Sequence, residues 1–337
     1  QRQMCIRDRI KSGDYITPYY YDGRMRFRKP ILTYWILVLA YRLFGINLFS
    51  SRIFFLLAGS IVVFLTYKMT LLLFPDERRG VLAAGVIASN MTLFHTSIRS
   101  HPDILQCLFV SLSLYGFIHL IFKGKRDFLH YALAYGGAGL TVATKGSLGI
   151  FPVLFSFLFV LFLPQGEKKG VWERWRELIE PKSVALAIFI ALFWFAAILL
   201  KHGGMGIKGF LADQVGERFS GSKWYVIENI LLYLLGIGKD FMPWSLLLLL
   251  VLFMDRERIR GLLRDHRREI LFVFGWFLTV VLIFSAINIQ RSRYLLPTYP
   301  LLVAFFSALL IEGEEGRSSP VIVFLARWMI IVGIVMG

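Results

Sequence analysis

Four cations precede a short apolar segment near the start of this 337-residue chain, and their spacing suggests a binding chemistry. Arg24, Arg26, Arg28 and Lys29 lead directly into residues 31–44, which are apolar and aromatic. At about 1.5 Å per residue, a helix of this length reaches about 21 Å, whereas a hydrocarbon core is about 30 Å thick. The segment therefore predicts a helix along the membrane interface, with its cations level with lipid phosphates. A topogenic loop with solvated charges is the alternative.

Two further charges stand at the ends of apolar stretches. Asp103 follows Pro102 at an expected helix start, where an acid stabilises the positive end of the helix dipole. Lys145 separates two apolar stretches. It either extends its charge to the interface or forms part of a phosphate-binding wall.

The remaining motifs argue against several other chemistries. Cys5 and Cys107 have no paired spacing, and the six histidines include no HExxH, so neither a disulfide framework nor a zinc site is indicated. Residues 139–147 lack the spacing of a nucleotide-binding loop. The net charge of +16 is not accompanied by a soluble basic face with interleaved aromatic residues, so nucleic acid is not an expected partner.

The composition places nearly all of the chain in a membrane. Hydrophobic residues make up 57% of it, including 31 Phe and 8 Trp, which is too apolar for a soluble domain. Glycines at 136, 137 and 139 predict close helix packing in lipid. Apolar stretches separated by polar links predict ten crossings: 53–74, 80–97, 103–122, 128–144, 147–163, 183–200, 241–254, 270–287, 294–311 and 320–336.

The basic residues predict the orientation of these crossings. With the N-terminal segment outside, alternate links carry most of the cations and are expected to be cytoplasmic. Two long outer segments, 1–30 and 201–240, are nevertheless basic, which indicates anionic ligands. Within the second, residues 224–239 predict another interfacial helix that leads into a crossing near Pro243.

The expected organisation has five parts. An atypical leader (1–11) precedes an outer-face loop with its interfacial helix (12–47) and the first part of a bundle (48–200). An outer loop with the second interfacial helix (201–240) then leads to the second part of the bundle (241–337). The chain opens without an initiator Met and stops inside an apolar run, so we expect a fragment that lacks a first membrane helix and is truncated at its C-terminus.

Four stretches, in order, resemble a known family. Residues 12–45, SGDYITPYYYDGRMRFRKPILTYWILVLAYRLFG, resemble the first outer loop of lipid-linked-sugar glycosyltransferases related to protein O-mannosyltransferases and to the aminoarabinose transferase of lipid A. Residues 143–155, 241–249 and 284–302 resemble that family's TKG-P-x-G, L-P-W-S and Y-x-L-P-x-Y-P segments. The resemblance implies an all-α polytopic membrane protein with a GT-C-type helical bundle.

The resemblance also implies an activity and the residues involved. The expected reaction is an inverting transfer at the outer, periplasmic face of the inner membrane, from a polyprenyl-phosphate sugar to a lipid, glycan or protein acceptor. Asp103 matches an acid near the family's active site and is a second-tier catalytic candidate. Each cation could instead be an interface anchor. The candidate contacts of the donor phosphate are Lys29, Arg218, Tyr294, Arg291, Arg293 and Lys145.

Departures from the family pattern limit these expectations. The family's principal catalytic Asp lies shortly before the SGD motif, where this chain has QRQMCIRDRIK, so the catalytic residue is unknown and the fragment is expected to be inactive. Arg28 stands where many relatives have Glu. Gln214 stands near the place where some relatives have a His that binds a metal together with that Glu, so no cofactor is assigned and the metal site is in doubt.

Two alternative functions stay open. A lipid flippase or transporter would place ionisable groups at midplane depth, and a glycan polymerase or ligase would lack the F-x-K-P and Y-L-L-P elements.

Overall fold

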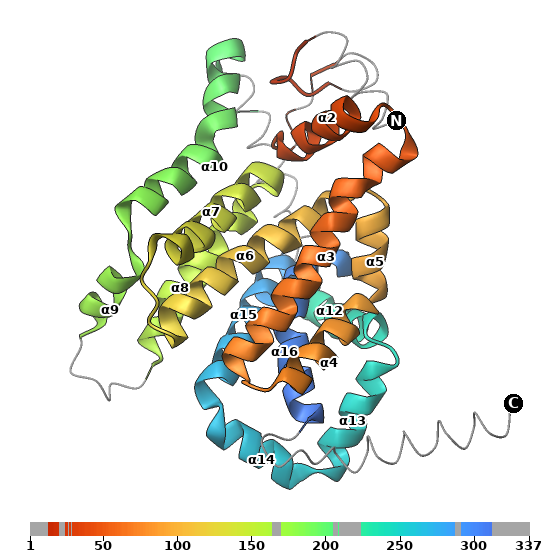
Figure 1. The fold of residues 1–337 in the computed structure, drawn as a ribbon, viewed down its shortest axis with the longest axis vertical. Coiled ribbons are helices and arrows are strands. Elements are labelled where there is room, and N and C mark those ends of the chain that lie inside the picture. Colours follow the sequence, from red (N-terminus) through yellow and green to blue (C-terminus); the bar gives the residue numbers. More distant parts are fainter. Residues whose placement is uncertain are drawn as a thin grey trace, which may run out of the picture.

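The structure is a computed structural model that describes residues 13–19, 24–25, 27, 29–163, 170–204, 208, 224–286 and 291–311. These residues are mainly helical, and an isolated antiparallel bridge joins Tyr19 and Met25. The elements of Figure 1 are α2 (Leu32–Phe44), α3 (Leu48–Leu73), α4 (Glu77–Ala88), α5 (Met91–Ile98), α6 (Pro102–Phe122), α7 (Phe128–Lys145), η1 (Ser147–Ile150), α8 (Phe151–Leu161), α9 (Val171–Leu178), α10 (Pro181–His202), α12 (Trp224–Asp240), α13 (Trp244–Met254), α14 (Arg256–Asp265), α15 (Arg267–Ser285), η3 (Ser292–Thr298) and α16 (Tyr299–Leu310).

Several of these helices are long and apolar enough to cross a membrane. Five qualify singly within the described residues, namely α3, α6, α10, α15 and the continuous stretch Ser292–Leu310. Two bent helix pairs raise the number to seven if each pair is one span. The protein is therefore a multi-pass, all-α membrane protein. The count of ten crossings stays a prediction, and the stretch 320–336 lies outside the described residues.

The two bent pairs differ in how far the sequence anticipates them. Val226–Asp240 and Trp244–Phe253 meet at 106°, as expected of an interfacial helix that leads into a crossing near Pro243. The stretch 80–97, expected as one crossing, is instead bent by 59° between α4 and α5. Asn90 explains this break because its side chain accepts a hydrogen bond from the Leu93 N–H at 2.9 Å and so caps a new helix.

Close backbone contact holds α6 against α7 and α7 against α10. A Cβ at position 137 would lie 2.6 Å from the Phe109 carbonyl oxygen, and one at position 139 would lie 2.7 Å from that of Ala187. Glycine at these two positions therefore permits the predicted close packing, because any side chain would collide with backbone. The same prediction is wrong for Gly136, where a Cβ would meet no atom within 4 Å.

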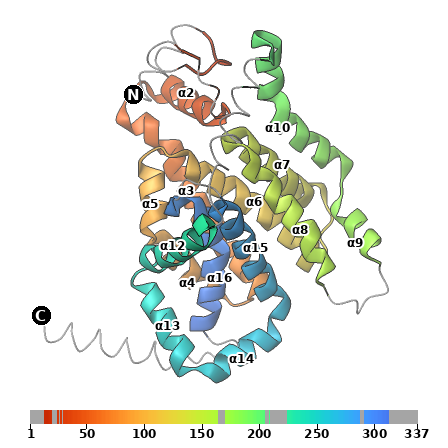
Figure 2. The same cartoon turned by 180° about the vertical axis from the view of Figure 1, so that it is seen from behind.

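Two ends of the bundle can be distinguished in both views. The segment around residues 13–19, α2 and the C-terminal end of α10 lie at one end, whereas α13 and α14 lie at the other (Figures 1 and 2). We call them the α2 end and the α14 end. Helix α6 runs between α3 and α7, and its side chains are mostly buried. Because α6 begins near α2, residues of its first turn lie close to the predicted interfacial helix.

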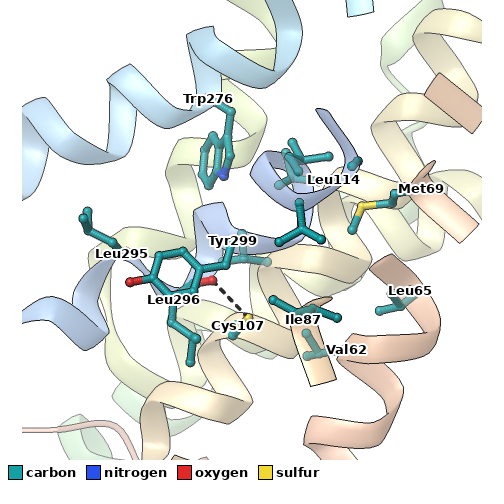
Figure 3. Packing of buried hydrophobic residues seen from close by; sticks show 14 of the residues in the cluster. Val62, Leu65, Met69, Ile87, Cys107, Leu114, Trp276, Leu295, Leu296 and Tyr299 are labelled. Atoms are coloured by element: carbon teal, nitrogen blue, oxygen red, sulfur yellow. Dashed lines mark hydrogen bonds between the residues drawn. The ribbon is translucent and has the colours of Figure 1, made fainter. Parts of the chain in front are cut away.

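The segment that carries Tyr294 is fixed by buried hydrogen bonds from two helices. Cys107 of α6 donates from its Sγ to the Leu296 carbonyl at 3.4 Å, the contact drawn in Figure 3. Trp276 of α15 donates from its Nε1 to the Pro297 carbonyl at 3.1 Å. Leu295, Leu296 and Tyr299 are fully buried in the same core. This packing gives η3 a defined position beside the first turn of α6.

Candidate functional site

A buried carboxylate at the start of α6 gathers charges from three other places in the chain. Asp103 is 1% exposed. Its carboxylate contacts the Lys145 Nζ and the His101 Nδ1, and the Arg293 Nε lies 3.6 Å away. A buried carboxylate is costly unless it is paired, and here the partners come from the α5–α6 turn, the end of α7 and η3. We call Asp103, His101, Lys145, Arg293 and Tyr294 the Asp103 cluster.

Tyr294 joins this cluster through its ring. The Lys145 Nζ lies 4.4 Å from the centroid of the Tyr294 ring, which is a cation–π distance. The Tyr294 ring also stacks on Phe284 of α15, with the ring centroids 5.0 Å apart and an angle of 25° between the ring planes. Lys145 therefore contacts both the acid and the aromatic ring, and this arrangement fixes the direction of its ammonium group.

Local backbone features place these side chains. Ser100, at the turn before α6, has a φ of 53°, and its hydroxyl donates to the Ser51 carbonyl of α3. Gly146 ends α7 with a φ of 94°, directly after Lys145, and its N–H donates to the Val142 carbonyl at 2.9 Å. Both residues have a positive φ, Ser100 in the turn between α5 and α6 and Gly146 directly after α7. The chain therefore turns at both places, and Asp103 and Lys145 lie at helix ends that meet.

Lys29 lies beside the Asp103 cluster. It lines a small pocket together with Pro30 and residues of α2, and the far wall of this pocket is formed by Pro102 and Thr144. Pro102 and Thr144 are the sequence neighbours of Asp103 and Lys145. The structure thus brings the cation before α2 close to the two charged helix ends, although they are remote in sequence.

The other predicted contacts of the donor phosphate have different outcomes. Arg291 is exposed at the start of η3, where its carbonyl accepts a hydrogen bond from the Tyr294 N–H at 2.9 Å. Arg218 lies outside the described residues, so its approach to Lys29 and Tyr294 stays a prediction. Arg28 and Gln214, which bear on the metal question, also lie outside them. A guanidinium at position 28 is a cation and supplies no metal ligand, so we assign no step to a metal.

A second charged cluster, absent from the predictions, lies at the same end of the molecule, and we call Asp14, Thr17, Lys201 and His202 the Asp14 cluster. Asp14 accepts hydrogen bonds from the N–H groups of Ile16 and Thr17, both at 3.1 Å, and pairs with the Lys201 Nζ at 2.7 Å. Burial raises the pKa of Asp14, but these bonds outweigh it and hold that pKa well below its usual range. The Thr17 hydroxyl also lies 2.8 Å from the His202 Nε2, which ties this segment to the end of α10.

Sequence signals for the residues that were not predicted are weak but identifiable. Asp14 followed by Thr17 fits a turn in which a carboxylate accepts from the backbone two and three residues ahead. His101 stands two residues before Asp103, so the sequence shows that the two are neighbours. It does not show that the His101 ring contacts the Asp103 carboxylate. Phe284, which supports Tyr294, is one of 31 phenylalanines and carries no individual signal.

The helical bundle and its charged cluster at helix ends define a multi-pass, all-α membrane protein with a candidate site at one end, and comparison with known proteins assigns its family. The model of the family described as dolichyl-phosphate-mannose-protein mannosyltransferase matches residues 28–200, and the chain belongs to that family. The match contains Lys29, Asp103 and Lys145. The predicted family and fold class are therefore confirmed.

Individual relatives extend the similarity across most of the chain. An uncharacterized protein of Aquifex aeolicus is 26% identical over 97% of this chain and 61% of its own length. The undecaprenyl phosphate-alpha-4-amino-4-deoxy-L-arabinose arabinosyl transferase of Pseudomonas aeruginosa is 28% identical over 92% of this chain and 54% of its own length. The crystal structure of ArnT from Cupriavidus metallidurans bound to undecaprenyl phosphate has the same fold, with a TM-score of 0.76 at 19% identity, covering 92% of this chain and 55% of that one. The chain thus spans 54–61% of the length of these proteins.

Proposed function

We propose that the protein transfers a sugar from a polyprenyl-phosphate donor to a lipid, glycan or protein acceptor at the outer face of the inner membrane. The observation that carries this proposal is the pocket that Lys29 shares with Pro102 and Thr144, next to Asp103 and Lys145. Lys29 supplies a cation to the pocket itself, and Lys145 and Arg293 gather at Asp103, whose sequence neighbour Pro102 forms part of the pocket wall. A phosphate leaving group requires such positive charge nearby. The activity for which the Pseudomonas relative is named supports an undecaprenyl-phosphate sugar as the donor class.

The geometry supports different roles for the cations and for Asp103. Lys29 is placed to bind the donor phosphate, and Lys145 and Arg293 supply positive charge where negative charge develops on the leaving group. Asp103 is fully enclosed and already contacts Lys145, His101 and Arg293. It therefore acts as a positioning residue that holds these cations, rather than as the base that accepts the acceptor's proton.

The position of the charges along the helices favours this function over a flippase or transporter. Asp103 lies in the first turn of α6, Lys145 in the last turn of α7, and Arg293 near the start of η3. A transporter is expected to hold its ionisable groups at midplane depth, between broken helices. A site at helix ends instead suits a donor whose phosphate stays at headgroup level while its lipid chain stays in the bilayer.

Neutralising Lys29 tests the proposal. In the full-length gene product, purified and supplied with a labelled undecaprenyl-phosphate sugar, Lys29→Met should weaken donor capture by one to two orders of magnitude. A charge-assisted contact is worth about 1.5–3 kcal/mol, which corresponds to that range. Arg260→Gln, on α14 at the opposite end, is the matched control and should leave capture unchanged. Equal capture by wild type and Lys29→Met at limiting donor would return Lys29 to the role of an interface anchor.

The proposed orientation has its own test. Cysteines introduced at Asp22 and Lys223 should react with an impermeant thiol reagent added outside intact cells. Cysteines at Lys168 and Arg260 should react only after the cells are opened, because basic links stay cytoplasmic. Labelling in the reverse pattern would place the Lys29 pocket on the cytoplasmic face and overturn the orientation.

A further inference from the structure

The pocket that Lys29 lines also contains a buried hydroxyl group without a hydrogen bond. Thr33, in the first turn of α2, lines this pocket and is 9% exposed. Its Oγ1 is buried and makes no hydrogen bond with any residue that the structure describes. A buried hydroxyl that lacks a partner is costly, so its presence in a pocket indicates a ligand that supplies the partner.

Other buried threonines in the helices bond to their own backbone. The Oγ1 atoms of Thr66, Thr141 and Thr144 donate to the carbonyl four residues earlier, at 2.8, 2.8 and 2.7 Å. The equivalent bond from Thr33 would end at the Lys29 carbonyl and is not made. The hydroxyl of Thr33 is therefore not used by its own helix, unlike those of the other three.

The surroundings of the Thr33 hydroxyl favour an anion. No side chain caps the N-terminus of α2, and the first turn of this helix holds no acid. The N–H groups of a first turn and the positive end of the helix dipole attract negative charge, and Lys29 adds a cation to the same pocket. Asp103 is close in sequence to the pocket wall, but its carboxylate already contacts Lys145 and His101, which offset its charge.

The size of the pocket limits what reaches Thr33. Its volume is about 20 Å³, and a water molecule needs at least about 10–15 Å³. A whole phosphate or a sugar ring is larger than this, whereas a single phosphate oxygen fits. We propose that Thr33 donates a hydrogen bond to one oxygen of the donor phosphate, an inference that rests on the proposed function and adds a neutral contact to the charge of Lys29.

Binding of the donor, with and without its sugar, tests the proposal. In the full-length gene product, purified in detergent, Thr33→Val replaces the hydroxyl with a methyl group of similar size. Capture of the labelled undecaprenyl-phosphate sugar and binding of undecaprenyl phosphate alone should each weaken about ten-fold, because a hydrogen bond to a charged group is lost. Thr33→Ser keeps the hydroxyl and should bind both ligands nearly as wild type does. Unchanged binding of undecaprenyl phosphate by Thr33→Val would overturn the proposal, whether or not binding of the sugar donor changes.

Unfolding without ligand separates a binding role from a structural one. Thr33→Val removes an unpaired polar group, so it should unfold at the same temperature as wild type or a higher one. A lower unfolding temperature would show that the hydroxyl supports the fold and would overturn the proposal. Thr66→Val, on α3, is the matched control, since its hydroxyl bonds within its own helix, and it should leave binding of both ligands unchanged.

Lys29→Met distinguishes a failure of this inference from a failure of the proposed function. If Lys29→Met loses donor capture and Thr33→Val keeps it, the inference about Thr33 fails and the proposed function stands. If both variants keep donor capture, the pocket does not bind the donor phosphate and both proposals fail.

Discussion

Asp103 and Asp14 are both acids at the α2 end, yet they are held in different ways. Asp103 is 1% exposed, and the partners of its carboxylate are side chains from three separate elements. Asp14 is partly exposed and has one remote cation, the Lys201 Nζ at 2.7 Å, together with backbone N–H groups two and three residues ahead in the sequence. Its backbone contacts shape a local turn, which Lys201 ties to the end of α10. Asp103 has only side-chain partners among the contacts described, and it fixes the relative positions of several helices and the charges that they carry.

Removing each carboxylate should therefore have unequal effects, and this is the largest difference we expect. Asp103→Ala leaves Lys145 and Arg293, whose side chains are 12% and 30% exposed, without this anion, which should lower the free energy of unfolding by about 2–4 kcal/mol. Asp14→Ala loses hydrogen bonds and one partly exposed ion pair, which should cost about 1–2 kcal/mol. Denaturant unfolding of the two variants in the same detergent measures both values.

The donor-capture assay distinguishes the role of Asp103 from that of Asp14. Asp103→Ala should also abolish donor capture, because Lys145 and Arg293 lose their fixed positions, whereas Asp14→Ala should retain capture wherever it stays folded. Similar losses of stability in the two variants would contradict the distinction between a positioning acid and a turn acid.

Tyr294 allows a smaller and sharper test within the Asp103 cluster. Tyr294→Phe keeps the ring that faces Lys145 and stacks on Phe284, so stability should change by less than about 0.5 kcal/mol. Tyr294→Leu removes both ring contacts and should lower the free energy of unfolding by about 1–2 kcal/mol. If Tyr294→Phe loses donor capture while its stability is unchanged, the hydroxyl group contacts the donor. If neither variant changes stability, the ring contacts contribute nothing to holding Lys145.

The sequence predicted the positions of the helices better than it predicted the bends and contacts between them. The ends of α6 and α10 agree within two residues with the apolar stretches 103–122 and 183–200, because length and hydrophobicity are local properties. Helix α3 ends one residue before the predicted 74 but begins at Leu48, five residues before the predicted 53. The bend at Asn90 was not predicted, since a single capping residue divides a continuous apolar run. The bend near Pro243 was predicted because glycine and proline mark it.

The candidate site was predicted in part, through motifs rather than through geometry. Lys29, Lys145, Arg293, Tyr294 and Asp103 were selected as separate charges or family positions, and the structure brings four of them into one cluster with Lys29 beside it. The contact between Asp103 and Lys145 joins residues 42 positions apart, which no local pattern encodes. Asp14 was missed for another reason. Its importance depends on Lys201, contributed by the far end of α10.

The smallest expected effect concerns the pH dependence of the Asp14 cluster. Burial alone would raise the pKa of Asp14, but its hydrogen bonds and Lys201 lower it below the ordinary value of 3.8. A carboxyl group whose pKa is lower in the folded state stabilises the protein above its unfolded pKa and loses that contribution as the pH falls through the folded pKa. The difference in unfolding free energy between wild type and Asp14→Asn should therefore stay constant from pH 7 to about pH 4 and shrink only at more acidic pH. Unfolding curves of both proteins across this range measure it, and a difference that already shrinks between pH 7 and pH 5 would show that Asp14 is not stabilised in its ionised form.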